Sequence, residues 1–132
     1  MALGHYSVKT TSLALVFLLL TGCASSLEQM RTRNRENLLR LSLGMRKFDV
    51  LQIMGTETIK GINNPYRVET PKSQNGELYE VLFYNTEAKD NDGVVGENEL
   101  IPIVFEENKV IGWGWAFLSG VVPNYQYQIE VH

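Results

Sequence analysis

The feature that most constrains this chain is an unbroken run of eight apolar residues, 13–20, which follows Lys9 near the amino terminus. A helix of that length extends about 12 Å, whereas the hydrocarbon core of a bilayer is about 30 Å thick. The run is therefore too short for a permanent membrane span and is typical of the apolar region of an export signal peptide. We expect residues 1–22 to be that signal, which leaves residues 23–132 to fold as one domain.

A lipidation motif directly follows the apolar run. It matches the bacterial lipobox at four positions: Leu20, Thr21, Gly22 and Cys23. In that motif the cysteine thiol is alkylated by diacylglycerol, the chain is cut before the cysteine, and the new amine is acylated. Because Cys23 is the only cysteine in the sequence, an internal disulfide and a cysteine-rich zinc site are excluded. The alternative is a buried thiol in a core helix, but the preceding charged and apolar segments favour lipidation.

The motif also predicts a location. Several acyl chains together anchor a protein stably, so we expect residues 23–26 to be a lipidated cysteine and a short tether. Ala24 follows the cysteine, whereas enterobacterial sorting uses an Asp there for retention in the inner membrane. We therefore expect a protein anchored in the outer membrane and facing the periplasm. A formal net charge of −3 argues against nucleic acid as a partner, and no cofactor besides the lipid is expected.

Helical spacing followed by strand alternation predicts an α+β domain over 27–117. We expect one helix to begin near Leu27 with Ser26 as its cap, and a second to cover about 46–54 and end at Gly55. These helices should form a helical hairpin packed on an antiparallel sheet of three to four strands. The expected strands cover 66–70, 78–84, 100–105 and 110–117.

The last expected strand divides its residues by size. Side chains alternate across a strand, so one face should carry the large residues Ile111, Trp113, Trp115 and Phe117. The other face should carry the smaller residues Val110, Gly112, Gly114 and Ala116. We expect the bulky face to pack under the helical hairpin and the bare face to allow close approach of another backbone or a flat partner. Pro102 lacks an N–H, which predicts that the expected strand 100–105 lies at a sheet edge or is bulged at this residue.

Short stretches of these elements match a known pattern: Leu43-Gly44-Met45, Val50, Met54-Gly55, 79–84, 102–106 and 110–115. Over residues 43–117 they resemble an uncharacterised branch of the SmpA/OmlA/BamE-like family of small outer-membrane lipoproteins. The resemblance implies a two-layer sandwich, similar to β-lactamase inhibitor protein, and a role in outer-membrane assembly or maintenance. Two positions depart from the family, since Arg46 stands where Ser or Thr usually caps the helix and Glu57 stands where Pro is frequent.

The sequence predicts a binding protein and not an enzyme. His5 is removed with the signal peptide, and His132 is the last residue, a poor position for a rigidly oriented catalytic base. No serine occupies a nucleophile elbow. The candidate partner-binding residues are Trp113, Trp115, Gly112, Gly114, Tyr125 and Tyr127. Core packing is the favoured alternative for the aromatic row. In the tail 118–132, alternation predicts an extra strand that adds to a sheet edge of this molecule or of a partner in the envelope.

Two charged segments have alternative interpretations. In the loop 88–99, Asp90, Asp92 and Glu99 fall at the third, fifth and twelfth positions of a calcium loop. The first position is Ala88, which has no side-chain oxygen, so a solvated acidic turn is favoured over a calcium-binding or ligand-binding lipoprotein. The first helix carries four arginines, which form either a solvated face or a docking patch: Arg31, Arg33, Arg35 and Arg40.

Overall fold

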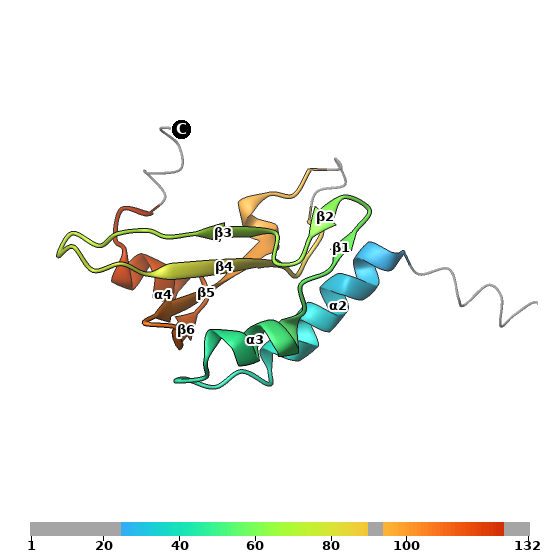
Figure 1. The fold of residues 1–132 in the computed structure, drawn as a ribbon. Coiled ribbons are helices and arrows are strands. Elements are labelled where there is room, and N and C mark those ends of the chain that lie inside the picture. Colours follow the sequence, from blue (N-terminus) through green and yellow to red (C-terminus); the bar gives the residue numbers. More distant parts are fainter. Residues whose placement is uncertain (1–24, 90–93, 126–132) are drawn as a thin grey trace, which may run out of the picture.

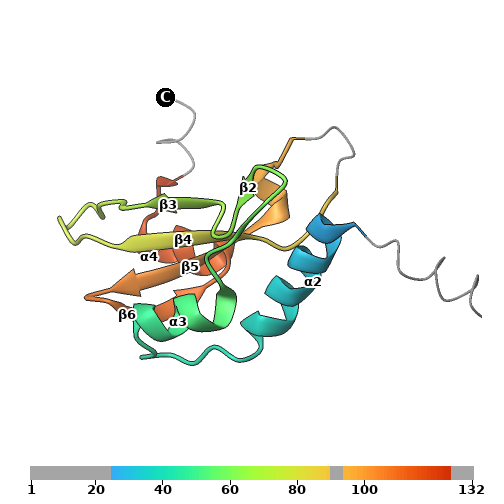
Figure 2. The ribbon, with the colours of Figure 1, turned by 45° about the vertical axis from the view of Figure 1, so that its right-hand side comes forward.

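The computed structural model describes residues 25–89 and 94–125. The elements in chain order are α2 (Ser26–Leu38), α3 (Lys47–Met54), β1 (Thr58–Ile59), β2 (Ile62–Asn63), β3 (Arg67–Glu69), β4 (Glu80–Asn85), the 3-10 helix η1 (Glu97–Glu99), β5 (Leu100–Glu106), β6 (Lys109–Trp113) and α4 (Trp115–Val121). A four-stranded antiparallel sheet of order β3-β4-β5-β6 confirms the expected α+β class. Helices α2 and α3 lie on one side of this sheet, and α4 forms a third layer on the other (Figures 1 and 2).

Helices α2 and α3 begin close to the predicted residues, and α3 also ends where predicted. Ser25, one residue before the predicted cap, caps α2 because its Oγ accepts a hydrogen bond from the N–H of Glu28 at 3.2 Å. Arg46 stands at the start of α3 and makes no side-chain capping bond. Gly55 follows α3 with a φ of 90°, a value that favours glycine, so the prediction that Gly55 ends this helix is confirmed.

Helices α2 and α3 enclose one apolar core against the sheet. Its buried members are Leu41, Val50, Met54, Leu82, Tyr84, Ile103, Phe105 and Val110. Val50 and Met54 are one helical turn apart, so both point from α3 toward the strands. The Tyr84 hydroxyl donates to the carbonyl of Gly55 at 3.3 Å, and burial raises the pKa of this phenol above its ordinary value.

A buried polar network interrupts the apolar side of α2. Asn34 is 1% exposed, and its Nδ2 donates to Asn64 Oδ1 at 2.8 Å and to the Asn85 carbonyl at 2.7 Å. The Nδ2 of Asn64 in turn donates to the carbonyl of Met54 at 3.0 Å. Asn34 therefore joins α2 to the end of β4 and, through Asn64, to the end of α3.

The strand predicted over 110–117 is wrong beyond Trp113. Gly114 adopts a φ of 94°, which turns the chain out of the sheet, and residues Trp115–Val121 form α4. This helix covers the face of the sheet opposite α2 and α3. The buried residues of the second core are Tyr79, Val81, Phe83, Leu100, Val104, Leu118, Val122 and Tyr125.

A β-bulge at Ile111 changes the order in which β6 presents its side chains. Val110 pairs with Phe105 of β5. The next pair joins Gly112 to Val104, so Ile111 is an extra residue with no partner of its own. The regular alternation that the sequence predicts is therefore broken in the middle of this strand.

The bulge explains why the predicted bulky and bare faces are wrong. Val110 and Trp113 pack on the side of α2 and α3, whereas Ile111 packs on the side of α4. Gly112 also faces α4, because a Cβ added to it would lie 2.6 Å from the ring carbons of Phe117. The bare backbone at Gly112 is thus covered by the chain's own Phe117 and is not open to a partner.

Pro102 lies in a central strand, and the prediction of an edge or a bulge at that residue is wrong. β5 is flanked by β4 and β6, and the bulge lies between Val104 and Phe105 on this strand. The N–H of Gly114 donates to the Pro102 carbonyl at 2.8 Å. Since the nitrogen and carbonyl of a strand residue point to the same side, the proline nitrogen faces the place where β6 ends. No ladder donor is needed at that point.

Candidate functional site

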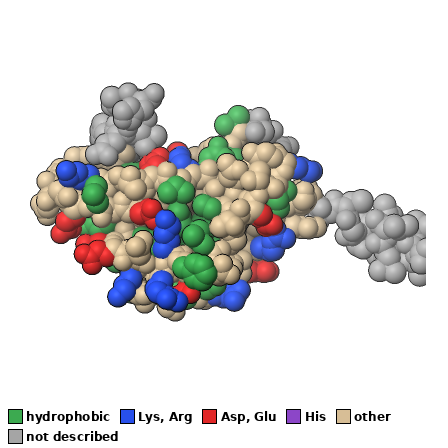
Figure 3. Space-filling view, viewed as in Figure 1, with side chains coloured by type: hydrophobic (Ala, Val, Ile, Leu, Met, Phe, Trp, Pro, Cys, Tyr) green, Lys and Arg blue, Asp and Glu red, His purple; other side chains and the backbone are tan. Residues whose placement is uncertain are grey.

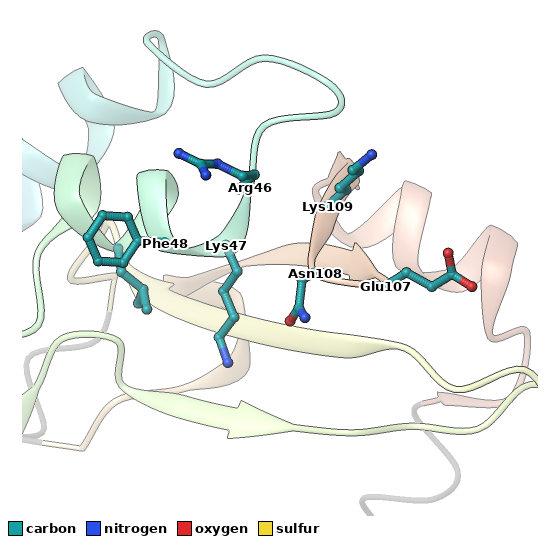
Figure 4. A pocket seen from close by; sticks show the side chains of 7 residues that line it. Arg46, Lys47, Phe48, Glu107, Asn108 and Lys109 are labelled. Atoms are coloured by element: carbon teal, nitrogen blue, oxygen red, sulfur yellow. The ribbon is translucent and has the colours of Figure 1, made fainter.

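An open pocket lies between the start of α3 and the turn that joins β5 to β6 (Figure 4). Its volume is about 570 Å³, and its lining residues are Arg46, Lys47, Phe48, Leu51, Glu107, Asn108 and Lys109. Glu107 and Asn108 have φ values of 50° and 64° and form a tight turn between the two strands. The N–H of Lys47 donates to the Asn108 carbonyl at 2.8 Å, so the helix and the turn are held together beneath the pocket.

An exposed aromatic ring forms the apolar part of this pocket. Phe48 is 65% exposed, and Leu51, three residues later on α3, is partly buried beside it. Phe48 is absent from the binding residues predicted from the sequence, although a helical signal was present. Successive helical residues are about 100° apart, so a residue two positions before the inward-facing Val50 points to the opposite side of α3.

Three cationic side chains line the pocket. In Figure 4, Arg46 lies between Phe48 and Lys109, whereas Lys47 extends toward the sheet. Lys47 Nζ lies 2.6 Å from a carboxylate oxygen of Glu80 in β4. Arg46 Nε lies 3.0 Å from Asp49, and this hydrogen-bonded carboxylate raises the pKa of the Arg46 guanidinium. Lys109 forms no ion pair with any residue that the structure describes, so its charge is available to an anionic group.

A second charged cluster lies on β3 and faces α4. Arg67 forms two bonds with the Glu97 carboxylate, at 2.5 and 3.0 Å, and its guanidinium lies 4.1 Å from the centre of the Phe83 ring. The Nε of Arg67 is 2.8 Å from Glu69, and Glu69 accepts a hydrogen bond from the Tyr125 hydroxyl. The cluster therefore joins β3 to η1 and to the residues after α4.

The pKa values of this cluster reflect partial burial and mutual charge. Burial lowers the pKa of Arg67, but the hydrogen bond with Glu97 and the charges of both carboxylates outweigh it, so the pKa is raised overall. Burial is the largest influence on Glu69 and raises its pKa. The positive charge of Arg67 opposes that shift, while the negative charge of Glu97 adds to it. The cluster is an ion network that holds these elements together.

The candidate tryptophans are not brought together, because they lie on opposite faces of the sheet. Trp113 packs against the core of α2 and α3. The Nε1 of Trp115 donates to the Leu100 carbonyl at 2.9 Å, and its ring centre lies 6.3 Å from that of Tyr125. Tyr125 is only 3% exposed, so the structure gathers these two aromatic candidates in the core beside α4.

The remaining candidates have separate positions. Gly114 lies at the start of α4, while Tyr127 lies outside the described residues, as do Asp90 and Asp92. Glu99 belongs to η1 and is 2% exposed, with its carbonyl accepting the N–H of Thr86 at 2.9 Å. Within residues 25–89 and 94–125, no three His, Cys, Asp or Glu side chains are grouped to hold a metal ion. The expected lipobox residues, Leu20, Thr21, Gly22 and Cys23, also lie outside these ranges.

Of the four arginines expected on the first helix, Arg40 lies beyond the end of α2, and the other three pair with carboxylates. Arg31 and Arg35 lie 3.4 and 3.1 Å from the oxygens of Glu28. Arg33 lies 2.5 Å from Glu57, which links α2 to the chain just before β1. These pairs satisfy the charges within the molecule, so the arrangement fits a solvated helix face better than a docking patch.

The comparisons with known proteins give one result. A family model described as "Protein of unknown function (DUF3192)" matches residues 20–119. Neither the curated proteins nor the solved structures contain a match to this chain. No helix in the described part of the chain is both long and apolar enough to cross a membrane. Because the matched residues make up most of the sequence and include all elements from α2 to the larger part of α4, the chain belongs to the DUF3192 family.

Proposed function

We propose that this protein is a lipid-anchored, non-enzymatic module that binds a protein partner at the periplasmic face of the outer membrane. The observation that carries the binding role is Phe48, an aromatic side chain that is 65% exposed in a pocket also lined by three cationic residues and Glu107. Burying such a ring contributes about 1.5–3 kcal/mol. Aromatic residues seated in pockets supply much of the affinity at protein interfaces.

The pocket also indicates the chemistry of the partner. Phe48 and Leu51 offer an apolar surface, and Lys109 offers a positive charge that no described residue neutralises. A partner segment that places an apolar side chain on Phe48 and a carboxylate near Lys109 would satisfy both. Opposite charges of this kind guide encounter and fix the orientation of a complex.

The proposed location depends on the sequence motif at Leu20–Cys23. The Ser25 cap starts α2 two residues after Cys23, so a lipid at this position would hold the folded domain close to the membrane surface. The resemblance to SmpA/OmlA/BamE-like lipoproteins remains a prediction, and it is consistent with two helices packed on an antiparallel sheet. It supports a role in envelope assembly or maintenance as a class.

Replacing Cys23 by Ser is expected to release the mature protein from membranes. The substitution removes the thiol that would carry diacylglycerol, and an acidic chain has little attraction for anionic lipid. Cell fractionation followed by mass spectrometry should find the protein that keeps Cys23 in membranes, with added lipid mass and without residues 1–22. An Ala24→Ser variant, which keeps Cys23, serves as the control. A Cys23→Ser protein that remains in membranes at its mature mass would contradict the anchor.

Replacing Phe48 by Ala is expected to weaken partner binding about 30-fold, because a central aromatic residue contributes at least about 2 kcal/mol. Folding should be unaffected, since the ring is mostly exposed. The measurement is quantitative recovery of envelope proteins crosslinked to the full-length protein in intact cells. Leu39→Ala is a matched control, because Leu39 is 88% exposed but does not line the pocket. Equal recovery from Phe48→Ala and the unmodified protein would show that the pocket is not the docking surface.

A further inference from the structure

Strand β3 is an edge strand with one neighbour among the described residues. The sheet order places β3 at one end, next to β4 alone. At the other end, β6 is covered in part, since the N–H of Val110 donates to the Met45 carbonyl at 2.9 Å. The N–H of Gly44 also donates to the Val110 carbonyl at 2.8 Å. The outer backbone groups of β3 have no such cover in the described chain and form a template for another strand.

The three residues of β3 are complementary to themselves. In an antiparallel pair centred on Val68, Arg67 of each copy lies opposite Glu69 of the other. Centring the pair on Arg67 or on Glu69 would instead place identical charges across from each other, which is unfavourable. Of these three registers, charge favours the one that is symmetric about Val68.

The two charged side chains of β3 are held in place by contacts within their own chain. Glu97 fixes Arg67 by two hydrogen bonds, and the Tyr125 hydroxyl fixes Glu69. Both charged side chains nevertheless keep part of their surface exposed, 24% for Arg67 and 30% for Glu69. Groups that are fixed before association lose little conformational freedom when a partner arrives.

Val68 supplies the apolar centre of the pair. It is 52% exposed and points to the side of α2 and α3, because it pairs with Leu82, a member of that core. Figure 3 shows apolar side chains running from β3 toward α3 on this face. Pro65 and Pro71 flank the strand and lack an N–H, which limits the edge to a short segment and disfavours extended edge-to-edge assembly.

We propose that a second copy of this chain pairs its β3 with β3, so that two four-stranded sheets become one continuous sheet across a two-fold axis at Val68. The contact is isologous, with the same residues on both sides, and therefore closes as a dimer. The inference goes beyond the proposed function, because it uses neither the pocket at Phe48 nor the lipid anchor.

Cysteine substitution tests both the dimer and its register. Residues directly opposite in an antiparallel pair have Cβ atoms about 4.5–5.5 Å apart, so two copies of Val68→Cys are expected to form a disulfide. Thr70 is exposed on the same edge, but in this register it lies opposite Tyr66 of the second copy. The thiols of two Thr70→Cys copies would be about 13 Å apart along the strand and should not react.

The measurement is the mass of full-length variants, purified in detergent without reductant, on unreduced gels. Val68→Cys is expected to run at twice the monomer mass, while Thr70→Cys and the unmodified protein, which keeps Cys23, run as monomers. Equal crosslinking of both variants, or none in either, would overturn the proposal. It would also be overturned if Val68→Cys reacted only after deletion of residues 126–132, because the chain's own C-terminal segment would then occupy the edge.

A charge at the two-fold axis provides a second test that needs no oxidation. Val68→Lys is expected to convert the dimer into a monomer in light scattering of the full chain in detergent, because two lysines would meet across the axis. Thr70→Lys, on the same edge, should leave the dimer intact. A monomeric unmodified protein, or a dimeric Val68→Lys variant, would contradict the proposed interface.

Discussion

Asn34→Leu is expected to lower the free energy of unfolding by about 3 kcal/mol. Leucine has a similar volume but cannot donate, so the side-chain oxygen of Asn64 and the carbonyl of Asn85 both lose the hydrogen bond that they receive at 2.8 and 2.7 Å. Each buried acceptor left without a partner costs about 1–3 kcal/mol. Asn34 is 1% exposed, so water cannot replace the lost donor without opening the contact between α2 and β4.

Denaturant unfolding followed by circular dichroism measures this loss. Asn37→Leu is the matched control, because Asn37 lies on the same helix but is only partly buried, and its change should be within about 0.5 kcal/mol. The network would have no structural importance if Asn34→Leu were as stable as the unmodified protein. Equal losses in the two variants would instead indicate a general effect on the helix.

Gly112→Ala is expected to lower the free energy of unfolding by about 1–3 kcal/mol through overpacking. The new Cβ would lie 2.6 Å from three ring carbons of Phe117, closer than carbon atoms can approach. The ring belongs to α4, so relief requires that the Phe117 side chain or α4 itself shift away from Gly112. The φ of Gly112 lies outside the positive region where glycine is favoured, so the cost should come from the contact and not from backbone strain.

A double-mutant cycle isolates this contact. In a Phe117→Ala background the ring is absent, and the additional cost of Gly112→Ala should fall close to zero. Gly120→Ala serves as a control, because nothing lies within 4 Å of the added Cβ and alanine favours the helix, so stability should rise by up to about 1 kcal/mol. A cost for Gly112→Ala that persists without Phe117 would show that another contact is responsible.

The elements that the sequence predicts well are those whose pattern is local. The spacing of Val50 and Met54 and the stop at Gly55 identify α3, and the apolar run before Asn85 identifies a central strand. β1 and β2 have only two residues each, too few for any periodicity, and their turn at Lys60 and Gly61 is visible only as φ values of 51° and 79°.

The features that could not be predicted depend on partners distant in the sequence. The bulge at Ile111 exists because of the register between β5 and β6, and the position of β5 inside the sheet depends on both neighbours. In the sequence Gly114 is one small residue among several, although its positive φ ends the strand. The aromatic residues after it resemble a continuing strand in sequence, but they enter a helix on the other face.

The candidate site was predicted in part only. The lipidation motif can be read from adjacent residues, so Cys23 remains the most specific prediction. The pocket at Phe48 requires a turn from residues 107–108 to lie beside α3, and no spacing in the sequence encodes that contact. Aromatic content alone points to Trp113 and Trp115, whose distribution between two cores depends on the bulge and the helix.

The extra residue in β6 has a consequence for how this fold tolerates changes in chain length. Shortening β6 by Ile111 would leave Val110 opposite Phe105 and Gly112 opposite Val104, so every later side chain would keep its present layer. Losing Gly112 instead would bring the Ile111 side chain opposite Val104, where the Phe117 ring leaves no room even for a Cβ. We therefore expect natural length variants of this strand to lack Ile111, the position at which a deletion leaves the architecture intact.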